Sequence, residues 1–116
     1  MMRGMMDQDL SDVTQDRGQA LREQLRQAAD RLTRARYIYD YGEKNLDVLR
    51  NSREAFINSL RNTGLSYYEA KIKYDNCVED QEYHLKSLDV EVDYAQRLYQ
   101  RAVADMQDSA DLARQD

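Results

Sequence analysis

The fold of this chain is decided by one short stretch near its middle, Arg61-Asn62-Thr63-Gly64-Leu65-Ser66-Tyr67-Tyr68-Glu69. The stretch is typical of a helix end followed directly by a helix start. Gly64 suits the left-handed residue that ends many helices, because a side chain would be strained in that conformation. Ser66 and Glu69 have the spacing of a capping box, which satisfies free amides of a first helical turn. So short a connection predicts two helices that lie antiparallel.

Apolar residues recur at alternating steps of four and three on both sides of this turn. A period of 3.5 residues held over five heptads indicates a coiled coil rather than an ordinary amphipathic helix. The first series is Leu21, Leu25, Ala28, Leu32, Ala35, Tyr39, Gly42, Leu46, Leu49, Arg53, Phe56 and Leu60. The second is Tyr67, Lys71, Tyr74, Val78, Gln81, Leu85, Leu88, Val92, Ala95, Tyr99, Ala102 and Met106.

The two series fit one antiparallel register. When Leu60 lies level with Tyr67, the numbers of facing residues add to 127, and every position of one series meets a position of the other. The same register brings Arg50 near Asp75, a pair that favours the register more than it stabilises the fold. Among the level pairs are Phe56–Lys71, Leu49–Val78 and Gly42–Leu85.

We therefore predict an all-α fold, a long two-helix antiparallel coiled-coil hairpin with its turn at Asn62–Ser66. A flexible N-terminal tail covers residues 1–10, and residues 11–116 form a single hairpin with helices over about 11–62 and 67–112. Gly42 is the weak point, since glycine inside a helix costs about 1 kcal/mol relative to alanine. The alternative is a three-helix bundle whose first helix splits at Gly42. A hairpin buries only one stripe of each helix, so we expect it to dimerise or to dock into a larger helical bundle.

Composition and charge narrow the partners and the compartment. The 116 residues include no Pro and only four Gly, which argues against sandwiches and barrels with their frequent turns. A net charge of −5 makes duplex nucleic acid and anionic membranes unexpected partners. No apolar run is long enough for a membrane span or a signal peptide. The single Cys77 suits a reducing compartment, so we expect the cytoplasm, or export without a cleavable signal peptide.

Residues that could carry chemistry are few. His84 is the only histidine, no Glu-x-x-His pair exists, and Cys77 lies two helical turns from His84, too far for direct activation. No glycine-rich phosphate loop is present. We therefore expect no enzymatic activity, metal, cofactor or small-molecule substrate, and we expect His84 and Cys77 to be half-buried beside the helix seam.

Several large apolar residues lie outside the two series. Because tyrosine is favoured at interfaces and a bare hairpin lacks burial, we interpret them as a docking face for a protein partner, a second copy of the chain, or both. The face would comprise Tyr37, Ile38, Tyr41, Val48, Tyr83, Val90 and Tyr94.

In length, acidity and its Gly-bearing turn, the chain resembles the WXG100 family, although Asn62-Thr63-Gly64 stands at the place of the family's Trp-x-Gly signature and the Trp is absent. In size and shape it is also similar to the helical partners of LXG toxins. As a long antiparallel hairpin it resembles the FliJ/YscO stalk proteins, which are usually longer and more basic. These resemblances imply a small helper, chaperone or co-secreted partner of a bacterial secretion system. The alternatives are an acidic inhibitor that mimics nucleic acid, and a structural stalk or assembly rod.

Overall fold

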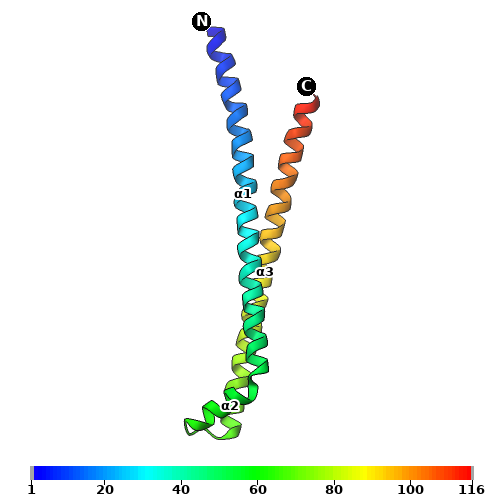
Figure 1. Cartoon of the computed structure of the whole chain (residues 1–116). Helices are drawn as coiled ribbons and strands as arrows, with labels where there is room; N and C mark the ends of the chain where they lie inside the picture. Colours follow the sequence, from blue (N-terminus) through cyan, green and yellow to red (C-terminus); the bar gives the residue numbers. More distant parts are fainter. Residues whose placement is uncertain (1, 116) are drawn as a thin grey trace. The chain divides into compact units, whose positions relative to one another are not determined.

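The chain folds into helices alone over the part that the structure describes (Figure 1). The computed structural model describes the backbone of residues 2–115 and the side chains of residues 16–112. Its helices are α1 (Met2–Asn51), α2 (Arg53–Asn62) and α3 (Tyr67–Gln115). Ser52 and residues 63–66 are the described residues outside them. The predicted all-α class is confirmed, whereas helix α1 begins at Met2 rather than at residue 11, so residues 2–10 of the predicted tail are helical.

The helices form two compact units, which we describe one at a time. The central unit spans Arg34–Asp93 and holds the end of α1, all of α2 and the start of α3. The terminal unit joins Met1–Thr33 to Tyr94–Asp116.

Contacts within the central unit follow the predicted register. Gly42 of α1 lies against α3 so closely that a Cβ atom there would be 3.2 Å from the Cδ1 atoms of both Leu85 and Leu88. Leu49 and Val78 pack against the same buried cluster. These contacts set α1 antiparallel to α3 in this unit, while the winding of the two helices into a coiled coil stays a prediction.

The turn between α2 and α3 has the predicted chemistry. Gly64 has a φ of 104°, and its amide donates to the carbonyl of Arg61 at 3.0 Å. The hydroxyl of Ser66 accepts a hydrogen bond from the amide of Glu69 at 3.2 Å, which is the N-cap half of a capping box. Residues 62–66 therefore end one helix and start the next, as the sequence predicts.

The prediction of one helix over residues 11–62 is wrong, because the helix breaks at Ser52, and α1 stays helical through Gly42. Two side-chain hydroxyls reach the carbonyls of the preceding turn. Ser52 Oγ donates to the Val48 carbonyl at 2.6 Å, and the Tyr74 hydroxyl of α3 donates to the Leu49 carbonyl at 3.1 Å. Side chains that insert into the backbone ladder in this way bend or interrupt helices.

The break changes which residues form the core next to the turn. Ile57 of α2 is buried with Ala70 and Tyr74 of α3, and Phe56 meets the Tyr74 ring edge-on at 5.5 Å between centroids. Phe56 thus packs against Tyr74, the next position of the second series after Lys71. Tyr67 and Lys71 are exposed, whereas the other ten positions of the second series and all twelve of the first are buried or half-buried.

The terminal unit has a core of small residues. Ala28 and Leu32 of α1 are buried, as are Ala95 and Ala102 of α3. Across the two helices, Gln24 Nε2 donates a hydrogen bond to Asp105 Oδ2 at 3.3 Å. The small side chains of Ala28, Ala95 and Ala102 let the two helices approach each other closely.

Candidate protein-interaction surfaces

The seven residues predicted for a docking face are all exposed. Tyr83 and Tyr37 are the most open, with 75% and 72% of their surface accessible, and Ile38 is the least open at 48%. The other four are Tyr41, Val48, Val90 and Tyr94. Large apolar side chains thus remain uncovered on both long helices, which is the exposure that a docking surface requires.

These residues separate into groups rather than lying on one face. Ile38, Tyr41 and Val48 share one side of α1, because their spacing of three and seven keeps them near one line along a helix. Tyr83 and Val90, seven apart, lie on the side of α3 opposite its buried positions, and Tyr37 lies on the matching outer side of α1. Antiparallel helices that pack through one seam turn these outer sides in opposite directions.

Tyr94 belongs to the terminal unit and has a cation beside it. The Arg31 guanidinium carbon lies 4.8 Å from the centroid of the Tyr94 ring. A cation over an aromatic face is attracted by the ring quadrupole, so this contact orients the ring while leaving it half open.

One flank of the central unit is composed of charged residues. In heptad notation, the residues of the two apolar series are the a and d positions, which face the partner helix. The e and b positions lie on one side of this seam, and the g and c positions lie on the other. Over residues 36–50 and 75–93, every e and b position is charged, with eight carboxylates against three cations. We call this set the charged flank: Arg36, Asp40, Glu43, Asp47, Arg50, Asp75, Glu79, Glu82, Lys86, Asp89 and Asp93.

A shallow groove runs along the charged flank. Tyr39, Leu46 and Leu85 contribute its apolar lining, and the remaining lining residues are charged-flank side chains from α1 and α3. Arg50 Nη2 lies 2.8 Å from Glu82 Oε1 across the groove. Arg50 thus pairs with Glu82 of the same flank, whereas the register from the sequence placed it near Asp75.

The surroundings of this groove change the pKa of Tyr39, one of its lining residues. Burial raises the pKa of the Tyr39 hydroxyl, and the nearby carboxylates of Glu43, Asp89 and Asp40 raise it further. A phenolate would therefore be disfavoured beside the acidic groove, and the phenol stays neutral at physiological pH.

Within residues 36–50 and 75–93 the opposite flank is nearly free of charge, and the cations Arg34 and Lys73 occupy c positions just outside these ranges. Over the same residues, the g and c positions hold seven uncharged side chains and only two carboxylates, Asp80 and Glu91. We call this set the neutral flank: Ile38, Tyr41, Asn45, Val48, Cys77, Asp80, His84, Ser87 and Glu91. Sequence reasoning missed the contrast between the flanks, although the heptad count could have found it by following the positions beside the seam.

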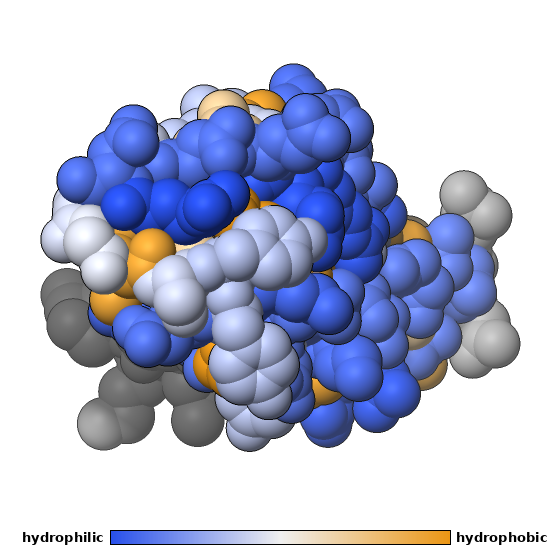
Figure 2. Space-filling view, turned by 90° about the horizontal axis from the view of Figure 1, so that it is seen from below, coloured by the Kyte–Doolittle hydropathy of each residue, from blue (hydrophilic) through white to orange (hydrophobic). Residues whose placement is uncertain are grey.

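The end of the central unit at the turn carries a further group of exposed apolar side chains. Tyr67, Tyr68 and Ile72, all in the first two turns of α3, are 50%, 71% and 41% accessible. Figure 2 views this end of the molecule and shows hydrophobic residues as small areas between hydrophilic ones.

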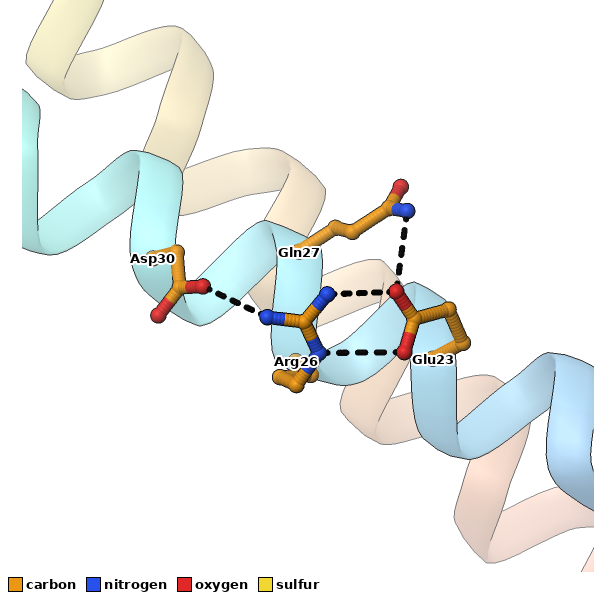
Figure 3. Close-up of polar contacts among 4 residues, drawn as sticks. All are labelled: Glu23, Arg26, Gln27 and Asp30. Carbon is orange, nitrogen blue, oxygen red and sulfur yellow. Dashed lines mark hydrogen bonds and ion pairs between the residues drawn. The ribbon is translucent and has the colours of Figure 1, made fainter.

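The densest basic run of the sequence lies along α1 and is partly neutralised there; it consists of Arg22, Arg26, Arg31, Arg34 and Arg36. Arg26 donates to Glu23 through two nitrogens and to Asp30 through a third, while Gln27 also donates to Glu23 (Figure 3). The Arg26 hydrogen bonds, helped by that of Gln27, hold the pKa of Glu23 below its usual value. A guanidinium held by two carboxylates is a poor phosphate contact.

His84 and Cys77 lie outside the helix seam, and the expectation that both are half-buried is wrong. Both are exposed, because they occupy g positions, which a seam of a and d residues does not cover. Over the described residues, no cluster of three or more His, Cys, Asp or Glu residues could hold a metal ion. No helix in that same part of the chain has an apolar stretch able to cross a bilayer.

Comparison of the chain with protein-family models, with curated proteins and with solved structures finds no match.

Proposed function

We propose that this chain is a non-enzymatic protein-interaction module in which α1 and α3 wind together as an antiparallel coiled coil. The observation that carries the proposal is the exposure of all seven predicted docking residues on helices whose seams are already covered. Exposed tyrosine and aliphatic side chains on rigid helices favour protein contacts, because they bury area at little cost in conformational entropy.

In its most concrete form, the module is a small helper, chaperone or co-secreted partner of a bacterial secretion system. It acts in the cytoplasm or is exported without a cleavable signal peptide. The outer sides of α1 and α3 offer a partner two separate contacts, one at Tyr37 and one at Tyr83 and Val90. An acidic mimic of nucleic acid is less well supported, since Arg50, Arg36 and Lys86 interrupt the acids of the charged flank.

The proposal is tested with a tagged chain used as bait in extracts of the source cells. Any captured protein is purified and its affinity for the wild type and for the Tyr37→Ser/Tyr83→Ser variant is measured. We expect the double variant to lose at least tenfold in affinity, because both outer contacts are removed. The matched control is Tyr68→Ser, which removes a tyrosine of similar exposure near the turn and should bind like the wild type.

Salt separates the two function classes. Docking through tyrosine and aliphatic contacts should change little between low and high ionic strength, whereas a mimic of nucleic acid should weaken steeply as salt rises. A partner that binds Tyr37→Ser/Tyr83→Ser as tightly as the wild type would contradict the proposed contacts.

A further inference from the structure

The neutral flank is an exposed surface to which the proposed function assigns no partner. Its α1 half is an unbroken uncharged stripe in which Ile38, Tyr41 and Val48 are 48%, 60% and 65% accessible. The α3 half continues the surface with Cys77, His84 and Ser87, which are also exposed. Solvated helices normally carry charge on such positions, as this chain does at every matching position of the charged flank.

The chain exposes more surface than a compact monomer of the same mass would. The chain exposes 9513 Å² of surface, whereas a compact monomer of 13.7 kDa exposes about 6,600 Å². A stable dimer interface of standard size buries about 1,200–2,000 Å² in total, which is a small part of the surface of two such chains. The core within one chain is thin, since five of the nine buried hydrophobic residues of the described part are alanines.

We propose that a second copy of the chain packs its neutral flank against the neutral flank of this one about a two-fold axis. The helices of the two central units then form a four-helix bundle. The inference rests on the proposed function as a protein-interaction module and assigns one of its surfaces to self-association. A two-fold dimer uses the same patch on both copies, so the patch must tolerate its own chemistry. A nearly uncharged flank meets that condition.

The charged flank selects this arrangement against the others. Two copies that approached through their charged flanks would set an excess of carboxylates against an excess of carboxylates, which is repulsive. A copy that placed its charged flank on the neutral flank would strip water from eleven charged side chains and offer them only two carboxylates, Asp80 and Glu91, as charged partners. The neutral-to-neutral approach avoids both costs and leaves the outer residues Tyr37 and Tyr83 accessible to a different partner.

The test compares the full-length wild type with the Ile38→Lys/Val48→Lys variant by light scattering across a wide concentration range. We expect the wild type to have the mass of two chains and the variant the mass of one, with equal helicity by circular dichroism. Lysine is a better helix former than either residue it replaces, so loss of the dimer would not come from loss of the helix. The matched control, Asp47→Lys, places the same side chain next to Val48 but on the charged flank, and it should remain a dimer.

Cys77 supplies a second readout in the unmodified chain. It is exposed in a single chain and lies on the neutral flank, so the proposed dimer covers it. Its alkylation by a maleimide should slow as the wild-type concentration rises, whereas in Ile38→Lys/Val48→Lys the rate should not depend on protein concentration.

Two results would overturn the dimer. One is a wild type that stays monomeric at every concentration, and the other is a dimer that Asp47→Lys dissociates while Ile38→Lys/Val48→Lys does not. If the wild type is monomeric but a captured protein loses affinity for Tyr37→Ser/Tyr83→Ser, the dimer is wrong and the proposed function stands. If the dimer forms and no other protein depends on Tyr37 and Tyr83, self-association stands and the proposed outer contacts fail.

Discussion

At the scale of single residues, Tyr74 connects the core to the break in the first long helix. Its ring is buried between Ile57 and Phe56, and its hydroxyl reaches the carbonyl of Leu49, 25 residues earlier in the chain. Arg53, the first residue after the break, has its guanidinium carbon 5.7 Å from the centroid of the same ring. A buried tyrosine needs a partner for its hydroxyl, and here the partner is a helix carbonyl.

Replacement of Tyr74 by phenylalanine tests that role. The Tyr74→Phe variant keeps the ring contacts and leaves the Leu49 carbonyl without this donor, so we expect a loss of about 0.5–1.5 kcal/mol in the free energy of unfolding. Urea denaturation followed by circular dichroism measures the change. The control is Tyr68→Phe, whose hydroxyl is exposed and should not matter; equal stability of the two variants would contradict the role assigned to the Tyr74 hydroxyl.

At the scale of elements, α1 contains two glycines in different surroundings. A Cβ atom at Gly18 would meet only the Arg22 guanidinium, at an ordinary 3.6 Å. A Cβ atom at Gly42 would lie 3.2 Å from two leucine methyl groups of α3, closer than ordinary contact. Glycine at position 42 thus allows the two helices to approach, although it weakens α1 as a helix.

The two glycines predict different effects of alanine. Gly18→Ala should raise the free energy of unfolding by about 1 kcal/mol, the intrinsic gain in helix propensity. Gly42→Ala should gain less than that, because Leu85 and Leu88 must move to admit the methyl group. Thermal or urea unfolding of both variants measures the two changes in the free energy of unfolding. An equal gain at both positions would show that Leu85 and Leu88 admit the methyl group without cost.

At the scale of the whole molecule, the excess of acidic residues is concentrated on the charged flank of the central unit, where mutual repulsion destabilises the folded state. The net charge is −5, and the charged flank of the central unit alone has five more carboxylates than cations. Like charges held along one flank repel, and Arg50 offsets this only for Glu82. The raised pKa of Tyr39 is a second sign of the same negative surroundings.

Salt should therefore stabilise the protein. We expect its melting temperature to rise as sodium chloride is increased from about 0.01 M to about 1 M, because the Debye length falls from roughly 30 Å to roughly 3 Å. The Asp89→Lys variant removes one acid and adds a cation at the groove, so it should melt higher at low salt and show a smaller increase with salt. A wild type and variant with parallel salt dependence would indicate that the charged flank contributes no net repulsion.

The sequence by itself determined the features that depend on neighbours along the chain. Gly64, Ser66 and Glu69 specify the turn because helix ends are local, and the heptad series specified the seam because a helix places every third and fourth residue on one side. The exposure of Tyr37 and Tyr83 followed from the same count. None of these conclusions needed knowledge of a distant contact.

The break at Ser52 and the core beside the turn could not be predicted from local sequence patterns. The Ser52 hydroxyl at the break donates to the nearby Val48 carbonyl, whereas the Tyr74 hydroxyl donates to the Leu49 carbonyl from 25 residues away, and no local pattern indicates which carbonyl a buried hydroxyl will reach. After the break, Ile57 is buried with Ala70 and Tyr74, and Phe56 packs against the same cluster. The division into charged and neutral positions can be read from the heptad count. The Arg50–Glu82 contact and the groove show which sides of the two helices lie on the same flank.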